Sequence, residues 1–168
     1  PDFRKSTLTG FITDLIENAR IMEEDPFRTL PDPKYYAGRS TSALQLADPT
    51  QSQLSSEERH TMAKTVEDAC LQEGKDKVIS VEAGEYDETF EEFVITSNGF
   101  EGSNRTTVYW TGATMTAQDE GDRRPAGSHW IGCRYRDDLP SLEDIGKTAA
   151  KRTLDLMGGK KIATGTLP

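Results

Sequence analysis

Histidine and cysteine are both scarce in this chain of 168 residues, which has only two of each. Cys70 and Cys133 are far apart and form no CxxC pair, which indicates a reduced cytoplasmic compartment and two small core residues. Neither His60 nor His129 has the second histidine that a zinc helix of the HExxH type needs, although the two could still meet in space. We expect no metal site, with His60 exposed on a helix and His129 in a strand.

Long apolar runs and an excess of positive charge are also missing. No run approaches the roughly 18 apolar residues that span a bilayer, and no signal peptide opens the chain, so we expect no membrane partner. The net charge of −9 argues against nucleic acid as a direct partner, because nucleic-acid readers usually carry a basic face. The chain opens on Pro1 rather than Met, so we expect a fragment or a processed product.

The familiar catalytic motifs are absent too: there is no GxSxG elbow, no P-loop and no GxGxxG. A Ser-His-Asp triad stays open as an alternative, because triads are defined in space. One acidic cluster could bind a cation, but we interpret it as a solvated charged turn beside a hairpin. It comprises Glu82, Glu85, Asp87, Glu88, Glu91 and Glu92. We therefore name no catalytic, cofactor-binding or metal-binding residue.

A small basic zone stands out against the acidic background. It comprises Arg123, Arg124, Arg134 and Arg136, and neighbouring strands carry Tyr109, Trp110 and Trp130. Aromatic rings beside arginines could form a stacking platform for nucleic acid. We favour the alternative, in which the aromatic side chains pack across strands and the arginines cover them.

Apolar periodicity predicts three helices. The first has an apolar stripe from Leu8 to Met22, a cap at Ser6 or Thr7, and an end at Asp25-Pro26. The second begins at Ser55 or Ser56 with a capping-box pattern, and Gly74 is expected to terminate it as the residue just beyond the helix. The third begins at Ser141 and stops at Gly158-Gly159.

Residues 26–54 contain four prolines and several serines and threonines. This composition predicts an irregular crossover, held to the surface by Tyr35, Tyr36, Leu44 and Leu46. Nearly 30 residues without regular structure are unusual in a compact domain. We expect part of the crossover to be mobile around Gly38-Arg39-Ser40.

Four strands rich in aromatic and β-branched residues are predicted at 77–83, 91–96, 106–117 and 129–136. Gly84 is expected to end the first strand. Asn98-Gly99 is a strong turn signal between the second and third, and a second glycine at 102 favours a connection longer than two residues. The predicted fold is α+β, with an antiparallel four-stranded meander sheet packed with about three helices in a single domain over residues 1–168.

An ordered set of segments resembles the TldD/PmbA family, also called modulator of DNA gyrase. In chain order they are Ala19-Arg20 to Asp25-Pro26, Leu30-Pro31-Asp32-Pro33, Ser97-Asn98-Gly99-Phe100-Glu101-Gly102-Ser103, the strand ending at Ala117, Ser141 to Leu156, and Lys160-Lys161-Ile162-Ala163-Thr164-Gly165. The SNGFxGS form and the K-[IV]-x-T-G ending are closer to PmbA, also called TldE, than to TldD. The resemblance covers nearly the whole chain.

The resemblance implies part of a cytoplasmic metalloprotease of two subunits that processes or degrades peptides, such as a microcin leader or an antitoxin. In that family the zinc site, HExxxH, lies in the TldD subunit and C-terminal to the region matched here. No zinc ligand is therefore expected in this chain, and zinc is expected only in the TldD-type partner. The partners implied are a TldD-type subunit or a second copy of the chain, and an extended peptide.

The role expected for these residues is assembly and peptide enclosure, because a peptide can add to a sheet edge through its backbone. The strand at 106–117 or the strand at 129–136 could offer that edge. An alternative is a module without enzymatic activity that modulates DNA gyrase, as the family's older name implies.

Overall fold

The computed structural model describes residues 4–39 and 44–166, and the chain divides into two compact units. The first unit comprises residues up to Arg39 together with Ile95–Phe100, and the second comprises the rest. Each unit is described by itself below. The predicted crossover contains two short 3-10 helices, η1 (Pro33–Tyr35) and η2 (Gln51–Gln53). Ser40, part of the predicted mobile stretch, lies outside the described residues.

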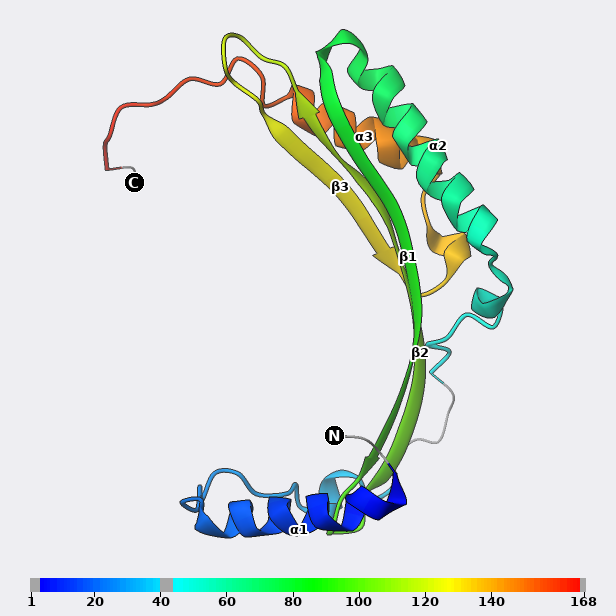
Figure 1. Ribbon diagram of the computed structural model, residues 1–168, viewed down its shortest axis with the longest axis vertical. Coiled ribbons are helices and arrows are strands. Elements are labelled where there is room, and N and C mark those ends of the chain that lie inside the picture. The colour runs from blue at the N-terminus through cyan, green and yellow to red at the C-terminus, as the bar shows by residue number, and fades with distance from the viewer. Residues whose placement is uncertain (1–3, 40–43, 167–168) are drawn as a thin grey trace. The chain divides into compact units, whose positions relative to one another are not determined.

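Helix α1 (Lys5–Ile21) belongs to the first unit and follows the predicted apolar stripe, yet none of its residues is buried (Figure 1). The predicted cap at Ser6 or Thr7 is wrong: both lie inside the helix, and Arg4 occupies the capping position. The hydroxyl of Thr7 donates instead to the carbonyl of Arg4 at 3.0 Å. The helix ends four residues before Asp25-Pro26, because the chain turns extended at Met22.

The Asn98-Gly99 turn is as predicted, with five residues between the strands that it joins. Gly99 has a φ of +92°, which favours glycine, and its N–H donates to the carbonyl of Thr96 at 3.1 Å. The Tyr36 hydroxyl donates to the Asn98 carbonyl at 2.8 Å. The Tyr36 ring meets Phe100 edge-on at 5.2 Å. Tyr36 therefore holds the crossover to the turn inside the first unit.

The second unit contains an antiparallel sheet of three strands in the order β1-β2-β3, not the predicted four. Strand β1 (Val78–Ile95) unites the first two predicted strands, β2 (Glu101–Ala117) is central, and β3 (Ala126–Cys133) pairs with its second half. Gly84 does not end β1, and the strand continues through it. A Cβ at Gly84 would lie 3.2 Å from the Trp130 ring, so glycine leaves room for that ring. The acidic residues predicted in a turn therefore lie along a continuous strand.

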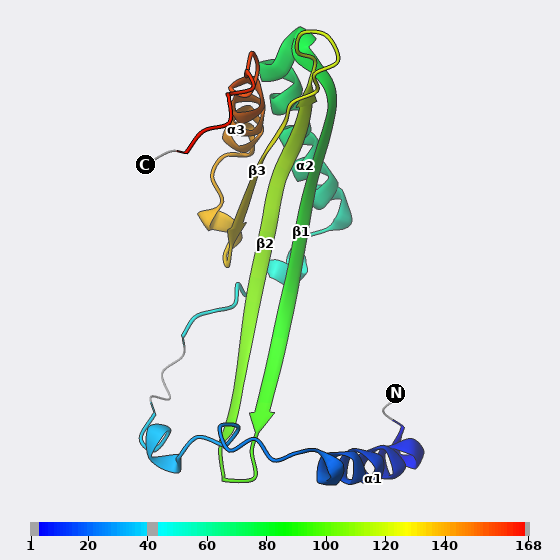
Figure 2. The same ribbon diagram turned by 90° about the vertical axis from the view of Figure 1, so that its left-hand side faces the viewer.

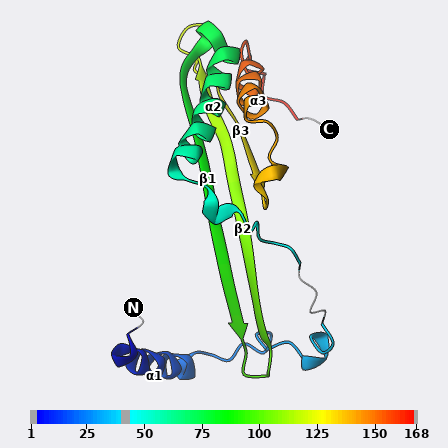
Figure 3. The same ribbon diagram turned by 90° about the vertical axis from the view of Figure 1, so that its right-hand side faces the viewer.

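Two helices of the second unit cover one face of this sheet; Figure 3 looks onto that face, and Figure 2 looks onto the opposite one. Helix α2 (Ser56–Gly74) has the predicted capping box between Ser55 and Glu58, and α3 (Leu142–Leu154) is capped by Ser141 as predicted. The α3 helix stops before Gly158-Gly159. Two further 3-10 turns, η3 (Lys75–Lys77) and η4 (Arg136–Asp138), lead into β1 and α3.

Small residues bring these layers close together. The buried core consists of Val66, Cys70, Ala113, Met115, Ala117, Ile145, Ala149 and Ala150. Gly146 of α3 lies against α2, where an added side chain would collide with the Val66 carbonyl and come within 2.9 Å of Ala69. Gly74 is helical and buried rather than the residue beyond α2, and Lys75 takes the positive φ of +52° instead. Glycine at position 74 leaves room for the sheet, because a Cβ there would lie 2.8 Å from the sulfur of Met115.

Candidate functional site: the open face and free edge of the sheet

The sheet face turned away from α2 and α3 carries two tryptophans, each lying over glycine of a neighbouring strand. Trp130 of β3 covers Gly112 of β2 and reaches Gly84 of β1, and a Cβ at Gly112 would lie 2.6 Å from its ring. Trp110 of β2 likewise covers Gly132 of β3, where a Cβ would lie 2.9 Å from the Trp110 ring. The indole N–H of Trp130 donates to the Thr114 hydroxyl at 3.3 Å. These contacts place both rings over glycines of the sheet.

Both rings remain open to solvent on their other side: Trp110 is 45% exposed and Trp130 is 38% exposed. Tyr86 and Phe90 of β1 are exposed as well, and side-chain alternation places them on the same face. We call this surface the open face, defined by Tyr86, Phe90, Trp110 and Trp130. Among the described residues of the second unit, the helices lie on the opposite side of the sheet (Figure 3).

The structure separates the aromatic residues that the sequence grouped together. Tyr109 points to the helix side and is fully buried, so it is not part of a platform with Trp110 and Trp130. The arginines separate too. Arg123 reaches the carbonyl of Gly159 and lies 3.5 Å from Asp119, whereas Arg136 lines a groove on the helix side. The cross-strand contacts of the two tryptophans are therefore made with glycines rather than with a buried aromatic neighbour.

The strand order decides which predicted edge is available. Residues 109–116 of β2 pair with β3 on one side and β1 lies on the other, so this part of β2 offers no edge. Strand β3 is an edge strand, and its residues 126–133 keep one side unpaired within the described sheet. Arg152 of α3 donates to the Ser128 carbonyl at 3.2 Å, so α3 reaches one end of the strand. The remaining backbone of β3 is the candidate edge.

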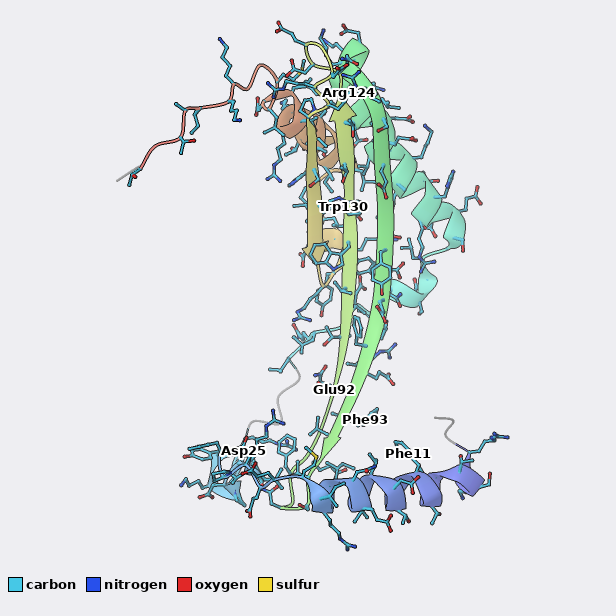
Figure 4. The ribbon with its side chains drawn as sticks, turned by 60° about the vertical axis from the view of Figure 1, so that its left-hand side comes forward. Phe11, Asp25, Glu92, Phe93, Arg124 and Trp130 are labelled. Carbon is cyan, nitrogen blue, oxygen red and sulfur yellow. The ribbon has the colours of Figure 1, made fainter. Side chains whose placement is uncertain are left out.

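Charge is distributed unequally over the sheet. Strand β1 carries carboxylates along its length, and alternation places Glu82, Glu88 and Glu92 on the open face. Arg134 follows β3, is exposed and continues the alternation of Trp130 and Gly132 on that face. Arg124 lies at the opposite end of the sheet, beside the start of β3 (Figure 4). The β1 edge is therefore acidic, whereas residues 126–133 of β3 carry neither a carboxylate nor a Lys or Arg.

Two other acidic residues of β1, Glu85 and Asp87, face α2 and are not solvated. Arg59 of α2 binds Asp87 with two nitrogens, and its Nε lies 3.9 Å from Glu85 Oε2. The Glu85 and Asp87 side chains are only 1% and 2% exposed. Burial and the neighbouring Asp87 raise the pKa of Glu85, whose oxygens have no hydrogen-bond partner in the described chain. The predicted solvated turn is thus wrong: the cluster lies in a strand, and two of its six acidic side chains, Glu85 and Asp87, are buried.

A second buried network fixes the segment that precedes α2. Asp48 accepts hydrogen bonds from the backbone N–H and hydroxyl of Thr50, the Tyr109 hydroxyl and the Arg136 N–H. Burial alone would raise the pKa of Asp48, but these donors outweigh it and lower the pKa to about 2. Burial and the same carboxylate raise the pKa of Tyr109. The network is structural, because it ties 48–50 to β2 and η4.

A groove of about 590 Å³ opens between the N-terminal ends of α2 and α3. Its apolar lining comes from Leu54, Met62, Leu139, Pro140 and Leu142. Its polar lining includes Glu57, Glu58 and Arg136. Both helix ends there are already capped, by Ser55 and Ser141, so their N–H groups are partly satisfied.

The scarce histidines and cysteines lie apart from these features. His60 is exposed on α2 and His129 lies on β3, as predicted, and burial and Arg152 lower the pKa of His129. Cys70 is a buried core residue and Cys133 is half-buried, and burial raises both thiol pKa values. Within residues 4–39 and 44–166, no three His, Cys, Asp or Glu side chains are grouped as a metal would require.

Comparison with known proteins identifies the family. Residues 49–157 match the model of the PmbA/TldA metallopeptidase central domain. A crystal structure from Bacteroides thetaiotaomicron, of a protein named as a proposed modulator of DNA gyrase, is 32% identical and has a TM-score of 0.86. The match covers 95% of this chain but only 36% of the other. The chain therefore belongs to the PmbA/TldD family, and it spans about a third of the length of the structures it matches.

A second solved structure shares the fold. It is a Thermotoga maritima protein, also named as a proposed modulator of DNA gyrase, with 23% identity and a TM-score of 0.66. The match covers 76% of this chain and 29% of the other. No curated protein matches the chain. None of the described helices combines the length and apolar character needed to cross a bilayer.

Sequence reasoning missed the positions that shape this site. Gly84, Gly112 and Gly132 matter because tryptophans cover them, and Arg59 matters because it meets Asp87 from another element. The local sequence holds no signal for either relation, since both depend on strand register and helix placement.

Proposed function

We propose that this chain is the N-terminal α+β region, extending through the central domain at residues 49–157, of a PmbA/TldE-type subunit of a cytoplasmic two-subunit metalloprotease. In this role it assembles with a TldD-type subunit, or with a second copy, and helps to enclose an extended peptide. The zinc belongs to the TldD-type partner, which would supply the Lewis acid for peptide hydrolysis. Membership of the metallopeptidase family supports the class of reaction.

The observation that carries the peptide role is the unpaired side of β3 beside the open face. A strand edge presents backbone N–H and C=O groups that an extended peptide can pair with, whatever its side chains. Strand β2 was an equal alternative from the sequence, but its segment 109–116 lies between two strands. We therefore propose β3 as the strand that the peptide joins.

Backbone-methylated peptides test whether the peptide binds by strand addition, without altering the protein. Two forms of a peptide that the reconstituted full-length pair cleaves would carry N-methyl groups at even or at odd positions. An added strand points alternate N–H groups at its neighbour, so only one form should lose binding, by about tenfold or more. Equal binding of both forms would contradict pairing with β3, and no cleavage of any peptide by the pair would contradict the protease role.

The names of the two structural neighbours favour a second function, modulation of DNA gyrase without proteolysis. Its test is direct binding of the full-length protein to purified gyrase, measured in the absence of a TldD-type subunit. Binding together with a changed supercoiling rate would support this function. Loss of the effect when the protein is freshly purified away from contaminating nucleases and topoisomerases would reject it.

A further inference from the structure

We propose that the β3 edge has one anchor subsite for an aromatic or large apolar side chain, formed by the Trp110 ring where it lies over Gly132. This inference rests on the proposed function, because it specifies one residue of the peptide that would join β3. Three features carry it: the direction of the free backbone groups, the direction of the two tryptophan rings, and the lack of charge on β3.

The register of the sheet shows which backbone groups of β3 are directed away from β2. The Ala117 N–H donates to the Pro125 carbonyl at 2.9 Å, and the pairs that follow keep the same register. Hydrogen-bonded pairs alternate in an antiparallel ladder, so the odd-numbered residues of β3 bond to β2 and the even-numbered residues direct their N–H and C=O to the free side. The Ser128 carbonyl agrees with this, because it accepts a hydrogen bond from α3. Trp130 and Gly132 therefore direct backbone groups toward an added strand.

The two tryptophan rings extend in opposite directions. The six-membered ring of Trp110 lies over Gly132 of β3, where a Cβ would be 2.9 Å from Cε2 and from Cζ2. The Trp130 ring lies instead over Gly112 of β2 and ends near Gly84 of β1, where a Cβ would be 3.2 Å from its Cη2. Trp110 thus extends from β2 toward the free edge, whereas Trp130 extends away from that edge. Of the two rings, Trp110 is the one placed to contact a side chain of an added strand.

Free backbone groups and an exposed ring coincide at Gly132. In a strand added to β3, the residue beside Gly132 directs its side chain to the open face, with its Cβ about 5 Å from that position. Gly132 has no side chain of its own, so the neighbouring group there is the Trp110 ring, which is 45% exposed. Pairs of aromatic rings gain free energy beyond the area that they bury. The subsite therefore selects one residue of the peptide, the one beside Gly132.

The charge of the sheet favours an uncharged segment at this edge. Residues 126–133 carry neither a carboxylate nor a Lys or Arg, and burial lowers the pKa of His129, which is therefore neutral at pH 7. An apolar segment along β3 thus covers no ionised side chain of that strand, and it avoids the cost of desolvating one. The other edge strand, β1, carries Glu82, Glu88 and Glu92 on the open face and would impose that cost.

The test uses the full-length protein and two labelled peptides of about twelve residues, longer than a typical strand, in which Thr and Ser alternate. One peptide has a single Phe at its centre, and the other has Ala at the same place. Fluorescence anisotropy should show the Phe peptide binding about tenfold more tightly, the gain expected from burying one aromatic side chain. Equal binding of the two peptides, or binding of neither, would overturn the proposal.

A photoreactive analogue of phenylalanine locates the anchor without altering the protein. With p-benzoylphenylalanine in place of the central Phe, irradiation should attach the peptide to Trp110 or to residues 130–134, as mapped by mass spectrometry of the digested protein. Cross-links confined to β1, or to residues outside this chain, would overturn the proposal.

Two matched variants assign the preference to one ring. Trp110→Ala should abolish the preference for Phe, because the ring over Gly132 is lost. Trp130→Ala removes the same side chain from the same face, but its ring extends away from the edge, so the preference should remain. The reverse pattern would overturn the proposal. Thermal unfolding shows whether each variant is folded; should Trp110→Ala not fold, Trp110→Leu keeps an apolar cover over Gly132 and should reduce the preference.

A second copy of the chain is the competing occupant, because β3 of one copy could pair with β3 of another. Analytical ultracentrifugation of the full-length protein, with and without the Phe peptide, separates the two. A bound peptide should leave the oligomeric state unchanged. Peptide binding that weakens as the protein concentration rises, together with a larger oligomer, would overturn the proposal, since a second copy would then cover the edge.

The outcome for this proposal can be told apart from that for the proposed function. If the reconstituted pair cleaves the Phe and Ala peptides with equal kcat/KM, and the two peptides bind equally, the protease role is supported and the anchor is refuted. If the pair cleaves no extended peptide, but the Phe preference and the cross-links are found, the protease role fails and the anchor stands as a peptide-binding site.

Discussion

At the scale of single residues, the composition of this chain does not reveal that two of its carboxylates, Glu85 and Asp87, are buried. Glu85 has neither a hydrogen-bond partner among the described residues nor solvent to stabilise its ionised form. Arg59 lies close by, but its short contacts go to Asp87. The two adjacent acidic residues therefore have opposite environments: Arg59 lowers the pKa of Asp87, whereas burial raises the pKa of Glu85.

Glu85→Gln should raise the melting temperature at pH 8 by a few degrees, the response of a domain this size to about 1 kcal/mol. A pKa that is higher in the folded than in the unfolded state means that ionisation destabilises the fold. That penalty is absent below the unfolded pKa and grows as pH rises through the range up to the folded pKa. Thermal unfolding at pH 4 and pH 8 checks this, and a variant less stable at both pH values would contradict it.

Asp48 should show the opposite pH dependence. Its folded pKa of about 2 lies below its ordinary value, so its ionised form stabilises the fold above about pH 4, and this contribution is lost as pH falls toward 2. Tyr109→Phe removes one donor and should cost about 1–3 kcal/mol at pH 7, and less at pH 2. Urea unfolding at both pH values measures this, and a cost independent of pH would show that the hydroxyl does not act through Asp48.

Close approach between helices depends on a single glycine in α3. Gly146→Ala places a methyl group against the Val66 carbonyl, Ala69 and the Cys70 nitrogen, and should cost about 1–3 kcal/mol. Gly10 of α1 is the matched control, since nothing lies within 4 Å of an added Cβ there. Gly10→Ala should be neutral or stabilise by up to about 1 kcal/mol, as in any open helix. Chemical denaturation compares the two, and equal effects would refute close packing at Gly146.

The long hairpin of β1 and β2 extends beyond the three-stranded part of the sheet. Strand β3 pairs only with 109–116 of β2, so the first half of β2 has β1 as its sheet neighbour and forms a two-stranded ribbon. Arg105 lies 3.6 Å from Glu91 across this ribbon, and Phe93 and Ile95 of β1 are largely exposed. Figure 4 shows Glu92 and Phe93 in this part of β1. Isolated two-stranded ribbons are marginally stable in water.

For the whole molecule, this exposure leads to a prediction about assembly. Addition of a TldD-type subunit to the full-length protein should slow hydrogen exchange in 88–95 and in 101–107, which follows it in the hairpin, because an interface would cover the exposed apolar side chains of 88–95. The amides of 109–116, already between two strands, serve as the internal control and should change little. Unchanged exchange in the ribbon would show that assembly uses another surface.

Local sequence was sufficient for features that depend on neighbouring residues. The capping box at Ser55, the cap at Ser141 and the turn at Gly99 all formed where predicted, because each rests on hydrogen bonds or backbone angles spanning a few residues. The family followed from segments in order along the chain, and the comparison with known proteins confirmed it.

Tertiary structure alone decided what the glycines and carboxylates do. Gly84 read as a strand end, yet it lies within β1 because Trp130 comes from β3 to cover it. Glu85 and Asp87 read as solvated, yet α2 buries them. Alternation along a strand shows which residues share a face, but whether that face meets a helix, a tryptophan or water depends on register and packing between distant segments. The open face is therefore a property of the folded sheet.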